Sequence, residues 1–192
     1  MRREGAGRER DAEPAAPPTR HGTAIARAGP AGVASGVAAA GVLLRGPAGV
    51  GKSDLAFRMI DAGRARLVAD DRVVVTPGPG PDAPATLSAP AALAGRIELR
   101  GLGVVRLEAH EVAPAARLLL IVDLVPRDTV PRLPAPDPVE LCGVAAPRLR
   151  LCAFDASTPA KILRALRLIE TGAGGVEDGI GPARPPLSRC AS

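Results

Sequence analysis

The sequence predicts a single α/β domain with a mixed sheet and flanking helices. Apolar runs of strand length recur along the chain, two stretches have amphipathic helical spacing, and turns rich in glycine and proline separate them. A chain of 192 residues with a hydrophobic fraction of 46% can build one substantial core, but two full domains would be small. We expect the domain to span residues 21–170, with a disordered, charged and proline-rich tail at 1–20 and a loose tail at 171–192.

The first expected elements are two short strands, a glycine-rich loop and a helix. "HGTAIARAG" at 21–29 and "GVAAAGVLLR" at 36–45 predict strands joined by a glycine turn. A helix is predicted from Lys52 to Gly63, because its apolar residues fall on one face and its charged residues on the other. The apolar face comprises Leu55, Ala56, Met59 and Ile60.

The remaining elements are mostly strands, followed by one more helix. "ARLVADDRVVVTPG" at 65–78 predicts an apolar strand that ends in two acids, with a continuation or hairpin after them. Further strands are expected within 95–108 and 116–125, whereas 126–138 is too rich in proline for regular structure. A helix is predicted to begin at Ser157 or Thr158, because proline follows in the first turn, and to end near Gly172.

Composition argues against nucleic acid as a partner. The chain has no Trp, no Tyr and two Phe, so it has few aromatic platforms for stacking bases. Its net charge of +5 comes from arginines scattered among acids and alanines, without a basic block.

Composition also argues against a membrane span and against a disulfide or zinc framework. Residues 28–44 carry no charge, but Pro30 and several glycines interrupt them, so neither a signal segment nor a span is expected. The three cysteines are odd in number and lack metal-ligand spacing. We expect a cytoplasmic protein.

The strongest local signal is "GPAGVGKS" at 46–53, which fits glycine, four residues, then Gly-Lys-Ser. Such a loop surrounds phosphate oxygens with backbone N–H groups at the start of a helix. Lys52 is one of two lysines among 25 basic residues, which suggests a site that needs a compact ammonium. Ser53 offers a hydroxyl to Mg²⁺. The predicted nucleotide-binding residues are Gly46, Pro47, Ala48, Gly49, Val50, Gly51, Lys52 and Ser53.

The loop does not name a reaction, and two strand-end acids compete for the catalytic role. The chain contains no Asn or Gln, which excludes signalling GTPases that read guanine with Asn and orient water with Gln. Asp123 follows "LLLIV" and has the position of a metal-holding acid in an ATPase or small-molecule kinase. Asp70 and Asp71 follow another strand and could supply a general base, although Asp71 could equally form a surface pair with Arg72. A nucleotide-binding regulatory module without turnover is a further alternative.

Four segments together resemble the catalytic domain of HPr kinase/phosphorylase, over about residues 20 to 170. They are "HG" at 21–22, "GPAGVGKSD" at 46–54, "RLVADDRV" at 66–73 and "GRIELRGLG" at 95–103, and the last is the most specific. The resemblance implies a fold similar to phosphoenolpyruvate carboxykinase. It also implies transfer of phosphate from ATP, with Mg²⁺, to a serine of HPr, the phosphocarrier of the sugar phosphotransferase system. The family also catalyses phosphorolysis of the phosphoserine.

The resemblance assigns roles to individual residues. Asp70 would take the proton of the serine hydroxyl, Lys52 would stabilise the transferred group, and Ser53 and Glu98 would hold magnesium. His21 matches the histidine that precedes the family's phosphate loop and would lie near the phosphate or Asp70. Arg100 belongs to the signature, although a surface ion pair would also explain it.

The chain departs from the family's pattern at several positions. It lacks the amino-terminal domain of the long form, so it looks like the short form of alphaproteobacteria. Pro47-Ala48 replaces a common Asp-Ser pair, and "PAKI" at 159–162 replaces a Pro-Gly-Arg-Asn segment, where Lys161 could compensate. Arg132 fits only loosely the arginine tied to dephosphorylation. The departures at 132 and 159–162 therefore concern phosphorolysis more than the kinase reaction, whereas Pro47-Ala48 concerns regulation or nucleotide preference. The family also suggests a homo-oligomer, a hexamer.

Overall fold

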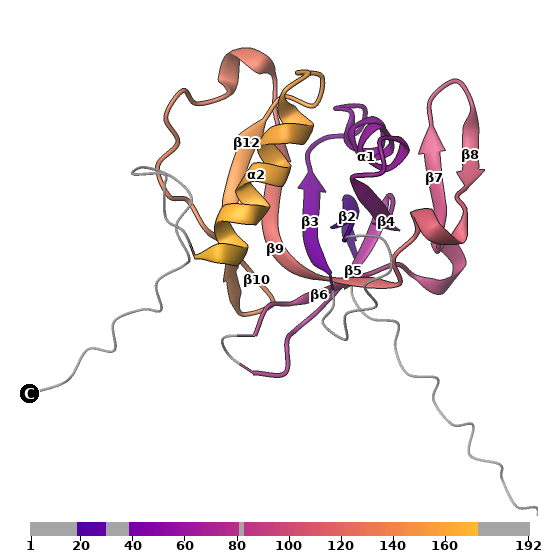
Figure 1. Ribbon diagram of the computed structural model, residues 1–192, viewed down its shortest axis with the longest axis horizontal. Helices are drawn as coiled ribbons and strands as arrows, with labels where there is room; N and C mark the ends of the chain where they lie inside the picture. Colours follow the sequence, from indigo (N-terminus) through magenta and orange to yellow (C-terminus); the bar gives the residue numbers. More distant parts are fainter. Residues whose placement is uncertain (1–18, 30–38, 81–82, 173–192) are drawn as a thin grey trace, which may run out of the picture.

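The computed structural model describes residues 19–29, 39–80 and 83–172, and it confirms the predicted α/β class. Most of the two predicted tails, and the turn expected between the first two strands, lie outside these ranges. An eight-stranded mixed sheet forms the centre, with two α-helices and two small hairpins around it (Figure 1).

Both predicted helices are present, α1 at Lys52–Asp61 and α2 at Thr158–Thr171. Pro159 lies in the first turn of α2, and Gly172 follows its last residue in a left-handed conformation with φ 59°. The strands in chain order are β1 (Thr19–His21), β2 (Thr23–Arg27), β3 (Ala40–Arg45), β4 (Ala65–Ala69), β5 (Arg72–Thr76), β6 (Thr86–Ser88), β7 (Arg96–Leu99), β8 (Gly103–Arg106), β9 (Ala115–Leu124), β10 (Val139–Leu141), β11 (Val144–Ala146) and β12 (Arg148–Leu151).

The sheet is parallel only at its centre. Its strand order is β1-β5-β6-β9-β3-β2-β4, and β12 pairs with the carboxyl-terminal half of β9. β3, β9 and β12 run parallel to one another, whereas the other pairings in this sheet are antiparallel. The loops that leave β3, β9 and β12 therefore emerge at one edge of the sheet, where ligands of α/β proteins usually bind.

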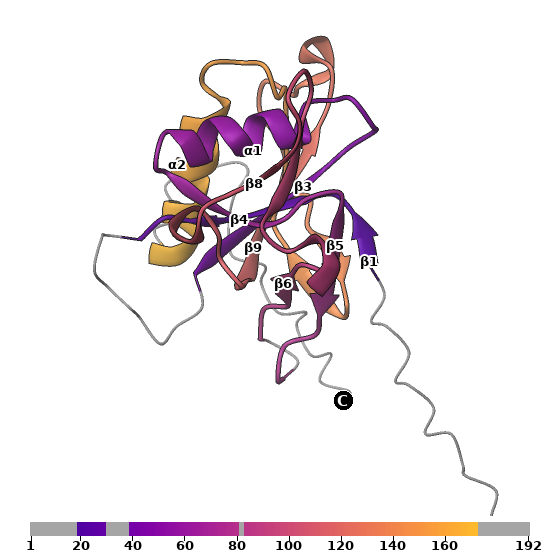
Figure 2. The same ribbon diagram turned by 90° about the vertical axis from the view of Figure 1, so that its right-hand side faces the viewer.

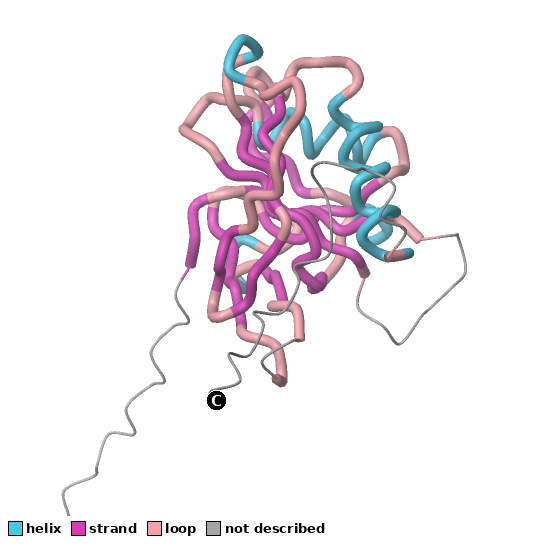
Figure 3. The backbone as a smooth tube through the Cα atoms, turned by 90° about the vertical axis from the view of Figure 1, so that its left-hand side faces the viewer, coloured by secondary structure: helices cyan, strands magenta, loops and turns pink. Residues whose placement is uncertain are grey.

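The two faces of the sheet are covered differently. Both helices pack on one face, where α1 and α2 share a core cluster with β3, β9 and the β7–β8 hairpin (Figure 3). On the other face the sheet curls, and β5 and β6 pack with the β10–β11 hairpin over a second cluster (Figure 2). The helices are thus segregated to one face, and their N-terminal ends lie near the parallel edge.

Two strand segments, 19–27 and 65–76, are each interrupted by a bend, and the two bends lie next to each other. β1 and β2 are separated by Gly22, and β4 and β5 by Asp70 and Asp71, so the strand predicted from residue 65 ends at the two acids, as expected, and continues as a second strand that does not pair with it. Gly22 donates its backbone N–H to the carbonyl oxygen of Asp71 at 3.1 Å. A Cβ on Gly22 would lie 2.8 Å from the carbonyl oxygen of Leu44, so only glycine fits this close approach. Asp71 adopts φ 63°, a left-handed conformation that aspartate tolerates better than most residues.

The proline-rich segment 126–138 is irregular apart from the short 3₁₀ turn Arg127–Thr129, as expected. β6, β12 and the β10–β11 hairpin were not predicted from the sequence. No helix within the described ranges is long and apolar enough to cross a membrane.

Candidate phosphate-transfer site

The loop 46–53 leaves the end of β3 and leads into α1, in the arrangement that the motif predicts. Its glycines adopt conformations closed to most other residues, with φ 140° at Gly46, 80° at Gly49 and 97° at Gly51. Gly51 caps α1 without a side-chain hydrogen bond, so the first N–H groups of the helix have no side-chain acceptor there. The loop and the helix end together form a cradle for an anion.

Lys52 is buried at the first position of α1 and points back over the loop. Its Nζ donates hydrogen bonds to the carbonyl oxygens of Gly46 and Pro47, each at 2.9 Å. An ammonium group has three N–H donors, so one is left for a phosphate oxygen. Burial lowers the pKa of Lys52 below its ordinary value, while the negative charges of Asp70 and Asp71 partly oppose that shift.

Asp70 is buried at the bend between β4 and β5 and faces the start of α1. Its Oδ1 accepts hydrogen bonds from Thr23 Oγ1 at 2.7 Å and from Ser53 Oγ at 2.8 Å. Its Oδ2 accepts the backbone N–H of Glu98 at 3.0 Å. These contacts occupy both lone pairs of Oδ1 and one of Oδ2, so one lone pair of Oδ2 remains for a proton or a cation. The bend therefore places a carboxylate, fixed by three donors, beside the phosphate cradle.

The donor set fits a magnesium ion that retains much of its water shell. Ser53 donates its proton to Asp70, so its oxygen is free to face a cation. Glu98 lies on β7 with an exposed side chain, and its backbone N–H already contacts Asp70. The described residues contain no cluster of three or more His, Cys, Asp or Glu that could enclose a metal ion. Magnesium is commonly held by one or two carboxylates and substrate phosphates, which matches this sparse set.

His21 ends β1 and contacts the acid next to Asp70. His21 Nδ1 lies 3.1 Å from Asp71 Oδ1, and both side chains are more than half exposed. Asp71 also has Arg72 Nε at 4.0 Å from its second oxygen. The structure therefore brings His21 to the rim of the site through Asp71, and Asp71 forms the surface pair with Arg72 that we considered from the sequence.

The competing acid, Asp123, is already neutralised. Arg45 is its neighbour across β3 and β9 and donates two hydrogen bonds to it, at 2.7 and 2.9 Å. Arg148 on β12 adds a third, at 3.3 Å. A bidentate arginine pair of this kind occupies both carboxylate oxygens. Asp123 would have to break these contacts to bind a metal, which disfavours it relative to Asp70.

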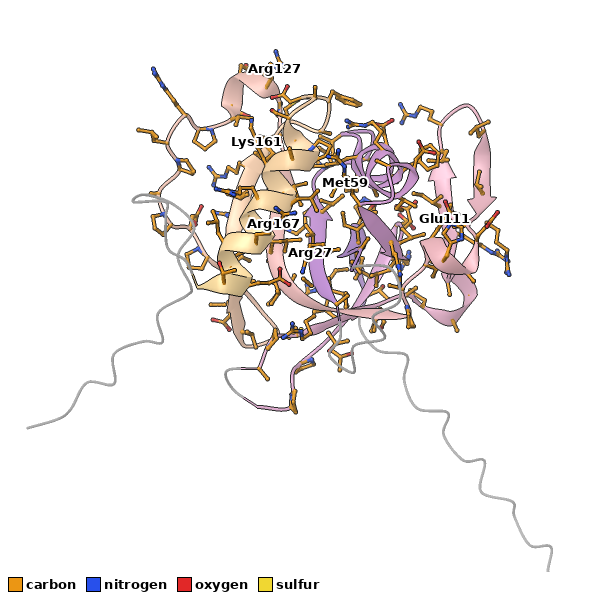
Figure 4. All side chains as sticks on the ribbon, viewed as in Figure 1. Arg27, Met59, Glu111, Arg127, Lys161 and Arg167 are labelled. Carbon is orange, nitrogen blue, oxygen red and sulfur yellow. The ribbon has the colours of Figure 1, made fainter. Side chains whose placement is uncertain are left out.

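Arg132 lies apart from Asp70 in this chain. It lines a groove of about 500 Å³ between the segment 130–134 and α2. Lys161, which is labelled on α2 in Figure 4, lines the same groove, together with Arg150 and Arg164. Neither Arg132 nor Lys161 is among the contacts of the phosphate loop or of Asp70. Contacts within one chain therefore do not support the predicted role of Arg132 and Lys161 in dephosphorylation.

Two residues of the site were missed or undervalued in the sequence. Thr23 is fully buried and donates to Asp70, but it looks like an ordinary strand threonine because the two are 47 positions apart. Arg100 is exposed, and its Nη2 lies 3.4 Å from where a Cβ on Gly49 would be, so its guanidinium reaches over the cradle. The "IELRGLG" segment was the available signal for Arg100, whereas Thr23 had none.

Comparison with known proteins gives one consistent result. Residues 26–165 match the family described as the HPr Serine kinase C-terminal domain. An HPr kinase/phosphorylase from Geobacillus thermodenitrificans is 38% identical over 99 residues, which cover 48% of this chain and 30% of that protein. Another from Levilactobacillus brevis is 35% identical over 94 residues, covering 49% and 29%. The aligned region thus spans less than a third of the length of these curated relatives.

A solved structure shares the fold. The Hpr(Ser) kinase/phosphatase from Coxiella burnetii superposes with a TM-score of 0.65, covering 81% of this chain and 94% of that chain. Sequence identity in this alignment is 23%, so the likeness concerns the fold alone.

Proposed function

Because the chain belongs to the HPr serine kinase family, whose pattern it matches over residues 26–165, we propose that it transfers the γ-phosphoryl group of ATP to a serine of HPr. The observation that carries this proposal is the contact between Asp70 and Ser53 at the start of α1. It joins a carboxylate to the phosphate cradle, where the reaction requires a base for the serine hydroxyl.

The reaction needs a base for the serine hydroxyl and a cation for the transferred group. Asp70 has one lone pair of Oδ2 available and takes the hydroxyl proton as the serine oxygen attacks the γ-phosphorus. The bond from the γ-phosphorus to the β,γ-bridging oxygen breaks, and ADP leaves. Lys52, with one N–H unused by the loop, stabilises the negative charge on the phosphoryl oxygens.

Magnesium would be held by the oxygen of Ser53 and by the carboxylate of Glu98, and when bound it neutralises charge on the phosphates. Asp70 accepts the Ser53 hydroxyl proton and the Glu98 backbone N–H, so it orients both residues. Arg100 adds a second cation on the Gly49 side of the cradle. His21 acts through Asp71 at the rim, where the serine of the partner protein would enter.

The same site can run in reverse. Inorganic phosphate would attack the phosphoserine, pyrophosphate would leave, and Asp70 would return the proton to the serine oxygen. We propose that Arg132 contributes to this reaction across a subunit interface, because it lies in the groove beside α2. In a hexamer of the family's kind, Arg132 of one copy would lie near the phosphate cradle of a second copy. The reaction would take place in the cytoplasm, where ATP and HPr are available.

A direct test incubates the protein with labelled ATP, Mg²⁺ and the HPr of its own organism, and then locates the phosphate by mass spectrometry. The proposal predicts one phosphoserine on HPr and no label when that serine is replaced by alanine. ATP hydrolysis without labelled HPr would indicate an ATPase or a small-molecule kinase instead. Nucleotide binding without turnover would indicate a regulatory module.

A further inference from the structure

An exposed aromatic ring lies against the phosphate cradle, where the proposed chemistry does not use it. Phe154 follows β12 and is 65% exposed, although large apolar side chains are usually covered. Because β3, β9 and β12 are parallel neighbours, the loop carrying Phe154 leaves the sheet at the same edge as 46–53.

The ring touches the last glycine of the cradle. A Cβ built on Gly51 would lie 2.8 Å from Phe154 Cζ and 3.2 Å from Cε1. The edge of the ring therefore abuts the backbone at the point where α1 begins, and much of the rest of the ring remains open to solvent. A ligand whose phosphates fill the cradle would extend past this ring.

Local contacts anchor the backbone that carries the ring. Thr158 is fully buried at the start of α2, and its Oγ1 donates to the carbonyl oxygen of Cys152 at 2.6 Å. Arg58 on α1 donates to the carbonyl oxygen of Ala153. The residues before Phe154 are thus tied to both helices, so the ring is carried by an anchored backbone rather than by a free loop.

We propose that Phe154 is the stacking platform for the purine base of the bound nucleotide. The only other aromatic residue, Phe57, packs against the core from α1, so it is less available for this role. The flat face of a base stacks favourably on an aromatic ring. The chain has no Asn or Gln, so it cannot read base edges with side-chain amides. Stacking is tolerant of base identity, and we therefore expect similar affinity for ATP and GTP.

The inference rests on the proposed function, because it requires that phosphates occupy the cradle. The test compares Phe154→Ala with the wild type by isothermal titration with ATP, GTP and inorganic tripolyphosphate, each with Mg²⁺. Base stacking accounts for about 1–3 kcal/mol per base, so Phe154→Ala should weaken ATP and GTP binding roughly 5- to 150-fold. Tripolyphosphate has no base, and its affinity should change less than about twofold. Phe154→Trp should bind ATP at least as tightly as the wild type.

Leu133→Ala is the matched control, since Leu133 is 78% exposed and lies in the segment beside α2. It should leave all three affinities unchanged. Equal loss of ATP and tripolyphosphate binding in Phe154→Ala would overturn the inference, because Phe154 would then only support Gly51. Unchanged ATP binding would overturn it as well. If the wild type binds tripolyphosphate as tightly as ATP, the stacking platform is refuted but the proposed function is not. If the wild type binds none of the three ligands, the proposed function is refuted as well.

Discussion

Replacing Thr23 with valine tests whether the buried hydrogen bond to Asp70 organises the site. The substitution removes the hydroxyl that donates to Asp70 Oδ1 at 2.7 Å and keeps the shape of the side chain. Thr23 has 0% exposure, so water cannot replace the lost donor without a rearrangement of the surrounding strands. Ser53 and the backbone N–H of Glu98 remain as donors, so Asp70 loses one of three contacts.

The size of the effect follows from the charge on Asp70. A hydrogen bond to a charged group contributes about 1.5–3 kcal/mol, so Thr23→Val should lower the free energy of unfolding by that amount. For a domain of this size, the melting temperature should fall by roughly 3–12 °C. Asp70 would also gain freedom to turn away from the serine hydroxyl, and misplacement of a catalytic group by about 1 Å can lower a rate up to 10²-fold.

Thermal unfolding and the rate of phosphate transfer to HPr measure the two effects. Thr23→Ser is the matched control, because it restores the hydroxyl and removes only a methyl group, and it should recover most of the transfer rate. A valine variant as stable and as active as the wild type would refute the reasoning. Equal loss of rate in Thr23→Ser and Thr23→Val would also refute it, because the effect would then come from packing and not from the hydrogen bond.

Two further predictions concern the cradle itself. In Lys161→Arg, Lys52 is the only lysine, and NMR of a ¹³C-labelled side chain should give it a pKa below that of an ordinary lysine, because burial disfavours the ammonium. Adding Asp70→Asn should lower this pKa further, since the charge of Asp70 raises it, and a rise would contradict the assigned geometry. Gly51→Ala should destabilise the protein by about 1–3 kcal/mol and weaken ATP binding, because φ is 97° there and the new Cβ would meet the Phe154 ring. An alanine variant with unchanged ATP affinity and melting temperature would show that the loop tolerates a side chain.

The elements that depend on contiguous residues could be predicted from the sequence. The loop 46–53 and α1 form one uninterrupted pattern, in which the glycines, the lysine and the helical spacing all agree. α2 was also recognisable, because Pro159 and Gly172 mark its two ends and the apolar spacing lies between them. In both cases local conformation and the burial of one face favour the same structure.

The parts that depend on distant pairing could not be read from the sequence. β12 is four residues long, follows the β10–β11 hairpin and pairs with β9, which lies far from it in the sequence. The two acids after "RLVA" predicted where that strand ends, but not the contact at the bend, where Gly22 from a distant part of the chain donates its N–H to the carbonyl oxygen of Asp71. Asp123 and Asp70 both looked like strand-end acids, and their tertiary contacts separate them, because Asp123 pairs with Arg45 and Asp70 accepts a hydrogen bond from Ser53.

The central claim is that Asp70, and not Asp123, acts on the serine hydroxyl at the phosphate cradle. The most direct measurement is the single-turnover rate of phosphate transfer to HPr for Asp70→Asn and for Asp123→Asn, with ATP binding and unfolding measured alongside. We expect Asp70→Asn to bind ATP and fold but to transfer phosphate about 10²- to 10⁴-fold more slowly, and Asp123→Asn to keep its rate in the fraction that is folded. Wild-type transfer by Asp70→Asn, or loss of transfer by a folded Asp123→Asn, would contradict the account.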